Sequence, residues 1–130
     1  MSQAQLEANK RLVLDFWRLV IEARNGDAAA DFLAEDLVQH NPLMGDGLAG
    51  FLERARVLWR GEPPRPPEPT LREPPILVLA EGDLVQLVHR RTLPDPADPM
   101  QVYDRFTFDL YRIERGKIVE HWDAVAKPGV

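Results

Sequence analysis

A paired-strand pattern near the C-terminus constrains this 130-residue chain more than any other stretch. Residues 102–114 are rich in aromatic and β-branched side chains, which favour strands. Residues 117–124 form a second strand pattern after Arg115 and Gly116, and glycine adopts the positive φ of a tight turn without steric cost. The two segments therefore predict a β-hairpin.

Asp109 interrupts the apolar character of the first of these strands. Because side chains alternate between the two faces of a strand, Asp109 shares a face with Thr107 and Tyr111. The opposite face carries apolar side chains, those of Phe106, Phe108 and Leu110. Aspartate is disfavoured in strands and costly to bury without a partner, so we expect a specific reason for this carboxylate.

The composition is that of an ordinary globular protein. Hydrophobic residues make up 45% of the chain and charged residues 28%, and the length suits one core, so we predict a single domain over residues 1–130. The net charge of −5 and the scattered basic residues predict neither a nucleic-acid partner nor a membrane surface. No apolar run approaches the roughly 20 residues of a spanning helix, and the N-terminus lacks a signal-peptide core, which predicts a cytoplasmic protein.

Three helices are predicted in the N-terminal half of the chain. Apolar residues recur with helical spacing over residues 4–25, and Gly26 is a natural end for this helix. Asp27 is typical of the residue that caps a second, short helix over residues 28–33. A third helix is predicted over residues 48–59. The apolar sides of these helices indicate core packing.

Two irregular segments accompany these helices. Residues 37–38 could form a short strand before a turn at His40, Asn41 and Pro42, because the residue before proline is pushed out of the helical region. Residues 61–75 contain seven of the twelve prolines, which excludes a helix and disfavours a central strand. We interpret this segment as a semi-rigid surface connector, with a flap over a pocket or a PxxP-type partner motif as the alternatives.

Two further strand patterns complete a predicted sheet. They cover residues 76–80 and 84–93, with a turn at residues 81–83, and in the second of them His89 and Arg91 share a face. The order of three helices followed by strands predicts an α+β fold, with the helices on one side of an antiparallel sheet.

Few catalytic chemistries are compatible with these residues. The chain has no cysteine, and its single serine, Ser2, lies beside the terminus, which argues against a nucleophilic triad. Residues 45–47 lack the spacing of a phosphate-binding loop. The three histidines, His40, His89 and His121, are far apart and lack zinc-site spacing, so we predict no metal and no other cofactor.

Acid–base chemistry on a carboxylate and an imidazole remains. Asp109 would be the base, because an apolar cavity favours the protonated form of a carboxylate and makes it a better proton acceptor. His89, on a strand of the same sheet, would donate a hydrogen bond to a developing enolate oxygen. The alternatives are an ion pair of Asp109 with Arg91 or Arg105, a His89 with a purely structural role, and solvent-facing positions for His121 and Asp123.

Three segments resemble the SnoaL-like polyketide cyclases, a family of the nuclear transport factor 2-like superfamily. They are FDLYRIERGKIVEHWD (108–123), VQHNPLMGDGLAGF (38–51) and AEGDLVQLVHRR (80–91). They occur in the family's order, and the resemblance extends over residues 5–127. It implies a cone-shaped α+β barrel, in which three N-terminal helices pack on a curved antiparallel (mixed) sheet around an apolar pocket, and a homodimer formed through the convex face.

The resemblance also implies a chemistry. Characterised cyclases of the family close a polyketide ring by intramolecular aldol condensation without a cofactor, so we expect a small hydrophobic carbonyl-containing ligand. The family's acid–base aspartate corresponds to Asp109, and a histidine of the neighbouring strand corresponds to His89. The pocket-lining turn corresponds to His40 and Asn41, and the closing strand to Trp122 and Asp123. The predicted substrate-binding set is completed by His121, Trp17 and Tyr111.

Other functions are compatible with the same resemblance. The superfamily includes ketosteroid isomerases, epoxide hydrolases, dehydratases and proteins that only bind a ligand, so the fold does not determine the reaction. In a non-catalytic binding domain, Asp109 would pair with an arginine and Trp122 would stack on the ligand. In an epoxide hydrolase, Asp109, Asp123 and Arg91 would supply parts of the site.

The apolar face around Phe106 is too hydrophobic to remain in water and predicts a dimer, unless helices cover it.

Overall fold

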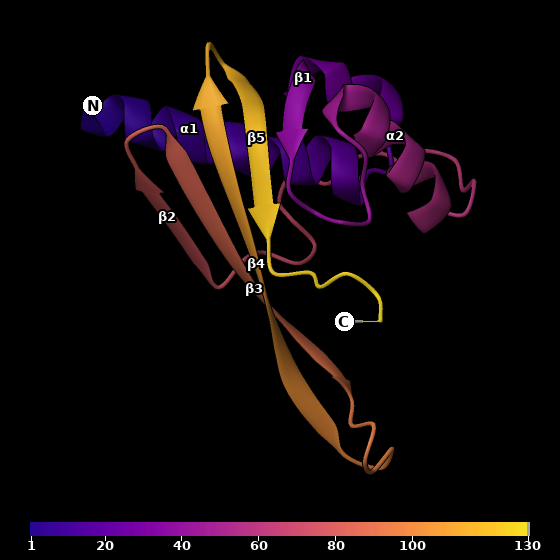
Figure 1. The fold of residues 1–130 in the computed structure, drawn as a ribbon. Coiled ribbons are helices and arrows are strands. Elements are labelled where there is room, and N and C mark those ends of the chain that lie inside the picture. Colours follow the sequence, from indigo (N-terminus) through magenta and orange to yellow (C-terminus); the bar gives the residue numbers. More distant parts are fainter. Residues whose placement is uncertain (130) are drawn as a thin grey trace.

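The computed structural model describes residues 1–129 and shows the predicted α+β fold, in which helices pack on a five-stranded sheet and strand β1 precedes the helix α2 (Figure 1). The helices are α1 (Gln3–Phe16), its π-helical continuation η1 (Trp17–Glu22), the 3-10 helix η2 (Gly26–Asp31) and α2 (Gly47–Leu58). The strands are β1 (Leu33–Gln39), β2 (Leu77–Glu81), β3 (Leu84–Pro94), β4 (Val102–Glu114) and β5 (Lys117–Asp123).

The sheet is mixed and curved, with the strand order β1-β5-β4-β3-β2. Strand β1 runs parallel to β5, and the other neighbouring pairs are antiparallel. At the β4–β5 turn, Arg115 and Gly116 have φ values of 53° and 73°, as the predicted tight hairpin requires. Strands β1 and β2 form opposite edges and do not pair, so the sheet curves around the cavity without closing on itself.

Strands β3 and β4 extend beyond the rest of the sheet as a two-stranded ribbon (Figure 1). Strand β5 pairs with β4 only as far as Asp109, and β2 pairs with β3 only as far as Val88. The β3–β4 pairing continues in register to Pro94 and Val102. The outer half of this hairpin is therefore held by its own ladder of hydrogen bonds.

The core lies between the helices and one face of the sheet. Strands β3 and β4 contribute the buried side chains of Val85, Leu87, Tyr111 and Ile113, and the first helix contributes Val13, Phe16 and Val20. The ring of Phe16 packs against Phe51 and Tyr111, with centroid distances of 5.6 and 6.3 Å. The opposite, convex face is exposed, as at Phe106 and Phe108, so strand alternation determines which side chains enter the core.

The first helix is less regular than its periodicity predicts. It becomes π-helical at Trp17 and ends before Gly26, which instead begins η2. Asn25, rather than the predicted Asp27, caps η2, because its side chain accepts a hydrogen bond from the backbone N–H of Ala28 (3.3 Å). π-Helical turns are rare and are found disproportionately at functional sites.

The proline-rich segment over residues 61–75 crosses the surface without regular structure. It is held against η1, because the Glu22 carboxylate accepts hydrogen bonds from the backbone N–H groups of Arg72 and Glu73, at 2.8 and 3.1 Å. The side chain of Arg18 also donates to the carbonyl of Glu68 (3.1 Å). These contacts match the connector interpretation.

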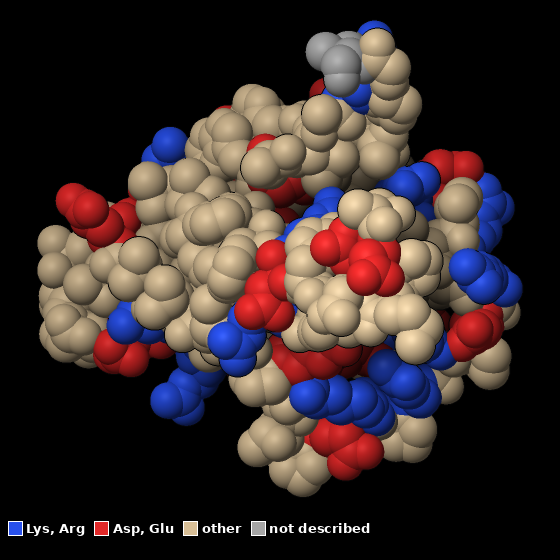
Figure 2. Space-filling view, turned by 90° about the horizontal axis from the view of Figure 1, so that it is seen from below, with Lys and Arg blue, Asp and Glu red and all other residues tan. Residues whose placement is uncertain are grey.

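Charges of both signs are distributed over the surface. In Figure 2, which views the molecule from below, acidic and basic side chains are interspersed on the visible face. Within residues 1–129, no helix combines the length and apolar character needed to cross a membrane.

Candidate active site

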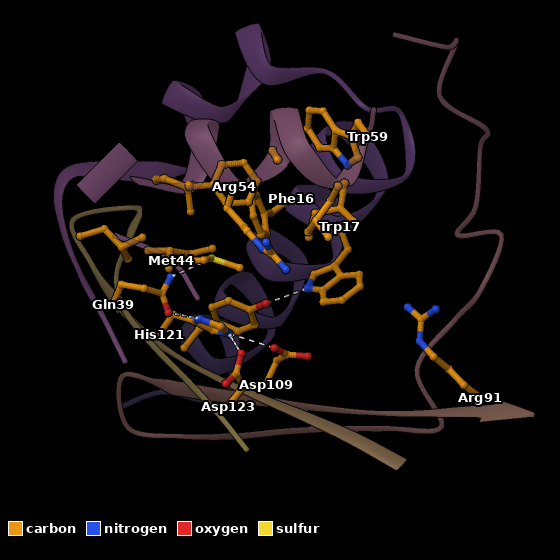
Figure 3. A pocket seen from close by; sticks show the side chains of 18 residues that line it. Phe16, Trp17, Gln39, Met44, Arg54, Trp59, Arg91, Asp109, His121 and Asp123 are labelled. Carbon is orange, nitrogen blue, oxygen red and sulfur yellow. Dashed lines mark hydrogen bonds and ion pairs between the residues drawn. The ribbon is translucent and has the colours of Figure 1, made fainter. Parts of the chain in front are cut away.

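An apolar cavity of about 250 Å³ lies between the helices and the concave face of the sheet. Its walls are mainly apolar, with Phe16, Trp17, Leu37, Phe51 and Trp59 among the lining residues. Polar side chains meet at the sheet side of the cavity, those of Gln39, Asp109, Tyr111, His121 and Asp123 (Figure 3). The carboxylate of Asp109 thus lies in an apolar cavity, as the strand alternation predicts.

Three strands bring these polar side chains together. In the β4–β5 register, Asp109 is opposite Asp123, and Tyr111 is opposite His121. In the parallel β1–β5 register, Gln39 is level with His121. Because residues two apart on a strand face the same way, all five side chains are directed to the concave face.

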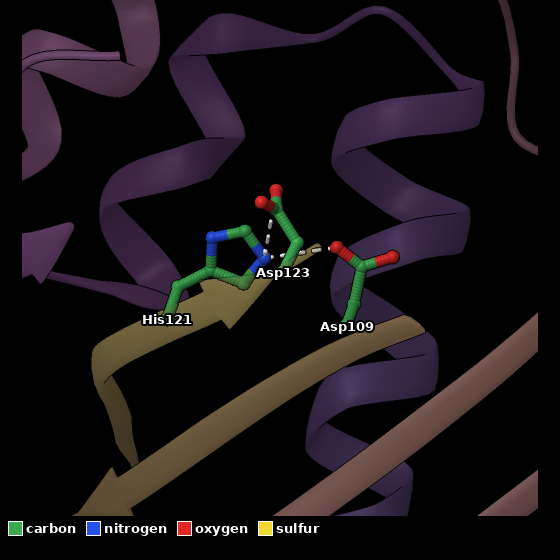
Figure 4. Close-up of side chains that lie close together, drawn as sticks. All are labelled: Asp109, His121 and Asp123. Atoms are coloured by element: carbon green, nitrogen blue, oxygen red, sulfur yellow. Dashed lines mark hydrogen bonds and ion pairs between the residues drawn. The ribbon is translucent and has the colours of Figure 1, made fainter. Parts of the chain in front are cut away.

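Hydrogen bonds determine which nitrogen of His121 carries a proton. The side-chain oxygen Oε1 of Gln39 accepts a hydrogen bond from the backbone N–H of Asn41 (2.9 Å), so the amide oxygen is the atom turned to this side. His121 Nδ1 lies 2.8 Å from the same oxygen and must therefore donate. On the other side of the ring, Nε2 lies 2.9 Å from Asp109 Oδ1 and 3.9 Å from Asp123 Oδ2 (Figure 4).

The hydrogen bond between His121 Nε2 and Asp109 Oδ1 requires a proton between these two atoms. With Nδ1 protonated, a neutral ring and an ionised carboxylate would direct two lone pairs at each other across 2.9 Å. Either the imidazolium donates to the carboxylate, or the carboxylic acid donates to the imidazole. The second oxygen of Asp109 points away from His121 (Figure 4) and has no hydrogen-bond partner among residues 1–129. That oxygen is free to contact a ligand.

Asp123 is oriented from the opposite side by the turn after β1. The Asn41 amide nitrogen donates to Asp123 Oδ2 (2.7 Å), while the Asn41 side-chain oxygen accepts from the backbone N–H of Leu43 (2.7 Å). Asp123 Oδ1 also accepts from the backbone N–H of Val125 (3.1 Å). Asn41 is itself absent from the cavity lining and contacts the site through Asp123.

Tyr111 supplies a neutral hydrogen-bond donor. The indole nitrogen of Trp17 donates to the Tyr111 hydroxyl oxygen (2.9 Å), and the Tyr111 ring stacks on His121 with centroids 4.9 Å apart. Burial, together with the nearby charge of Asp109, raises the pKa of Tyr111 well above its usual value. The hydroxyl therefore stays protonated at neutral pH, and its proton is available to a ligand.

His89 lies outside this hydrogen-bonded cluster. Its side chain is buried, its ring packs on Trp17 with centroids 4.5 Å apart, and it is not among the residues that line the cavity. Neither ring nitrogen has a hydrogen-bond partner within the described part of the chain. Burial lowers the pKa of His89, with partial compensation from Asp109. Trp17, rather than His89, faces the cavity, which places His89 away from the enolate contact that we expected.

Trp122 and His40 are also placed away from the cavity. On β5, Trp122 lies between His121 and Asp123, so alternation turns it to the convex face. Its ring stacks on His40 with centroids 5.0 Å apart, and the Arg112 guanidinium lies 5.6 Å from the Trp122 centroid. Neither residue lines the cavity, so the expected substrate contacts of Trp122 and His40 are not supported by their positions.

Three possible metal ligands converge in the same cluster. Nε2 of His121 and one carboxylate oxygen each from Asp109 and Asp123 lie within 4.8 Å of one another. Gln39 and Asn41 would orient two of these ligands, as outer hydrogen-bond partners do in metalloproteins. Imidazole and carboxylate groups together suit a divalent transition metal. This grouping departs from the predicted absence of a metal site, which rested on histidine spacing along the chain.

Gln39 is the residue of this site that sequence reasoning missed. Leu37, two residues earlier on β1, is buried in the core, so the same face of the strand continues to Gln39 at the cavity. A polar residue that ends an apolar strand face was the available signal, but the predicted strand stopped at residue 38.

Several solved structures share this fold. A candidate SnoaL-like polyketide cyclase from Jannaschia sp. CCS1 has a TM-score of 0.67 at 18% identity, with 95% of this chain and 90% of that chain covered. An NTF2-like protein of unknown function from Burkholderia pseudomallei has a TM-score of 0.65 at 17% identity, with 97% and 92% covered. A candidate polyketide cyclase from Acidithiobacillus ferrooxidans has a TM-score of 0.62 at 20% identity, with 95% and 90% covered. The fold is therefore that of the nuclear transport factor 2-like proteins.

Sequence comparison gives the family. A comparison with curated proteins finds no match. The family model described as the SnoaL-like domain matches residues 13–121, which include the end of α1, the other helices and most of the sheet. The resemblance inferred from the three sequence segments is confirmed, and the chain belongs to the SnoaL-like domain family.

Proposed function

We propose that this protein is a cofactor-independent acid–base enzyme that closes a ring in a small, largely apolar carbonyl compound by intramolecular aldol condensation. The hydrogen-bonded pair of Asp109 and His121 beside an apolar cavity carries this proposal. Membership of the SnoaL-like domain family and the candidate cyclases among the structural neighbours support the same class of reaction.

Asp109 removes the proton α to the first carbonyl. In the imidazolium–carboxylate form of the pair, the shared proton lies on His121, and the free Asp109 oxygen can accept a proton from carbon. The apolar walls of the cavity limit access of water, which strengthens the charge interactions there. A side chain that acts as a base in this way typically contributes about 10²–10⁴-fold to the rate.

Tyr111 stabilises the enolate that forms. Its hydroxyl oxygen already accepts a hydrogen bond from Trp17, so its own proton can be donated to the developing enolate oxygen. The raised pKa of Tyr111 keeps this donor neutral, so no second negative charge forms beside Asp109. In this proposal Tyr111 takes the role expected of His89 from the sequence.

Ring closure returns the proton. The enolate carbon attacks a second carbonyl carbon of the same molecule, so that one carbon–carbon bond forms and the second carbonyl oxygen becomes an alkoxide. Asp109, protonated in the first step, donates that proton to the alkoxide and yields a hydroxyl group. The sum is an isomerisation that consumes no water and returns Asp109 to its starting state.

The substitution Asp109→Asn tests this assignment, because an amide cannot accept the α-proton. We expect deuterium exchange at the α carbon of a bound ketone, followed by NMR, to fall at least about a hundredfold. The matched control is Asp104→Asn, since Asp104 lies on the same strand with its side chain on the exposed convex face. Full exchange in the Asp109→Asn variant would refute the assignment.

The paired carboxylates favour one second candidate, the opening of an epoxide by water. Asp109 and Asp123 both line the cavity, and their oxygens flank Nε2 of His121, an arrangement that could hold an attacking water. Incorporation of oxygen from labelled water into the product would identify this hydrolysis, because aldol ring closure incorporates none.

A further inference from the structure

We propose that Arg91 and Arg105 form an anion-binding subsite at the mouth of the cavity, which receives a carboxylate or phosphate group of the substrate. This inference rests on the proposed function and extends it to a substrate class. The substrate would be an apolar carbonyl compound with an acidic group at the end remote from the reacting carbon.

The first argument is the position of the two arginines in the sheet. Arg91 on β3 and Arg105 on β4 are directly opposite each other in the antiparallel register. Arg105 precedes Asp109 by four residues on β4, so the two side chains are on the same, concave face. Arg91 is opposite Arg105 and is therefore on this face as well. Like charges at directly opposite positions repel and destabilise a strand pair. An anion bound between the two guanidinium groups would remove this repulsion.

The second argument is that carboxylates of the protein leave these charges largely uncompensated. The one ion pair of Arg91 within residues 1–129 is with Glu73, at 3.8 Å, and both side chains are exposed. Arg105 makes no ion pair within residues 1–129. Arg112, on the convex face of the same strand, contacts both oxygens of Asp83 at 2.9 Å and Glu120 at 3.1 Å. Arg112 is therefore compensated by carboxylates of the protein, whereas Arg91 and Arg105 are not.

The third argument is that the two arginines line a groove continuous with the cavity. The outer groove contains Arg91 and Arg105, and it shares four lining residues with the cavity, namely Trp17, Arg91, Asp109 and Asp123. The two spaces therefore meet at the proposed base. In Figure 3, Arg91 extends from β3 on the same side of the sheet as Asp109.

The geometry gives the length of the ligand. Four residues of a strand correspond to roughly 13 Å between the Cα atoms of Arg105 and Asp109. This backbone spacing sets the scale of the separation between the acidic group and the reacting carbonyl of the ligand. Trp17 and Thr107 line the groove between them, and the Trp17 ring suits an alkyl or aryl link. Guanidinium groups match carboxylate and phosphate oxygens in a bidentate geometry.

Calorimetric titration with matched ligands tests the subsite. The probes are a long-chain methyl-keto acid (an oxoundecanoate), its methyl ester and decyl phosphate. We expect the wild-type protein to bind the acid about tenfold more tightly than the ester, which is a typical scale for one charge-assisted contact. The double variant Arg91→Gln, Arg105→Gln should bind acid and ester equally, with the ester affinity unchanged. Added salt should reduce the advantage of the acid.

Arg90→Gln is the matched control. Arg90 lies on the same strand and is exposed, but its side chain is on the convex face opposite Phe106. This variant loses one positive charge and should keep the preference for the acid. Tighter binding of decyl phosphate than of the keto acid identifies phosphate as the natural end group, and the reverse order identifies carboxylate.

Equal binding of acid and ester by the wild-type protein would overturn the proposal. A preference retained by the double arginine variant, or lost equally in Arg90→Gln, would also overturn it. Asp109→Asn separates this question from the proposed reaction, because that variant should keep its preference for the acid whether or not Asp109 is the base. The exposed positions of both arginines allow folding to be verified by an unchanged circular dichroism spectrum.

Discussion

His89 has a titratable side chain in surroundings that disfavour its charge. The ring is 4% exposed and packs on Trp17, and neither nitrogen has a hydrogen-bond partner among the described residues. A proton added to this ring would place a charge in apolar surroundings without a contacting carboxylate, which is why burial lowers its pKa.

This burial predicts a pH dependence of stability. Because the pKa of His89 is lower in the folded protein than the value of about 6.5 in the unfolded chain, the unfolded chain takes up the proton first as pH falls. The free energy of unfolding should therefore decrease from about pH 6.5 downward, until the pH passes the folded-state pKa. We expect the free energy of unfolding of the His89→Leu variant, measured by urea unfolding, to decrease less between pH 7 and pH 5 than that of the wild-type protein.

His40→Asn serves as the control for this prediction. His40 is partly exposed and pairs with Glu120 at 2.7 Å, so its replacement leaves the contribution of His89 intact. The same acid slope in His89→Leu and in the wild-type protein would contradict the prediction.

At the residue scale, sequence predicted the positions that depend on strand alternation alone. Asp109 was placed in the cavity because its face of β4 could be identified from the neighbouring residues. Its pairing with His121 depends on the β4–β5 register, which shifts between Arg112 and Ile113 and is not visible in the sequence. The resemblance predicts Trp122 as a substrate contact, but alternation along β5 turns Trp122 to the face opposite His121.

The turn from β1 into α2 depends on close backbone packing. A Cβ atom at Gly50 would overlap the backbone carbonyl group of Gly45, whereas a Cβ at Gly45 would be 3.7 Å from its nearest neighbour. This turn carries Asn41, whose amide holds Asp123. The first turn of α2 and the proposed active site are thus connected through one short segment.

We expect Gly50→Ala to destabilise the protein by about 1–3 kcal/mol, the usual cost of inserting a methyl group where there is no space. Gly45→Ala makes the same chemical change in ordinary van der Waals contact and should have little effect. Thermal unfolding followed by circular dichroism compares the two variants. Equal midpoints for Gly50→Ala and Gly45→Ala would show that the segment adjusts at no cost.

At the element scale, the hairpins were predictable and the first strand was not. The sequence of the β4–β5 turn contains a glycine that allows positive φ, so the two strands were located within about one residue. The parallel pairing of β1 with β5 depends on the path of the intervening chain, which composition does not encode. The π-helical turn at Trp17 leaves the apolar stripe nearly unchanged, so periodicity could not reveal it.

At the scale of the whole molecule, the convex face of the sheet carries exposed apolar side chains. The helices pack on the concave face, so they do not cover the apolar side chains opposite. Exposed apolar residues on β2 and β4 include Leu77, Leu79, Phe106 and Phe108, with 48–58% of each exposed. Apolar patches of this kind are typical of contact surfaces between subunits.

We therefore predict a homodimer formed through the convex face. The double variant Phe106→Glu, Phe108→Glu would place charges in that interface, and light scattering should then give the mass of one chain, 14.8 kDa, in place of twice that mass. Val57→Glu is the control, because Val57 is exposed on α2, away from the sheet. A wild-type mass equal to one chain would contradict the prediction.

The ribbon formed by β3 and β4 has a consequence for how such proteins diversify. Beyond Asp109 the two strands pair only with each other, so their length is independent of the packed interior. Inserting two residues in each strand between the base and the arginines would move the guanidinium groups outward by roughly 6.6 Å and keep them on the same face. Inserting one would turn them to the other side. The length of the hairpin would thus set the distance between the arginines and Asp109 in steps of two residues, while the reaction chemistry remains unchanged.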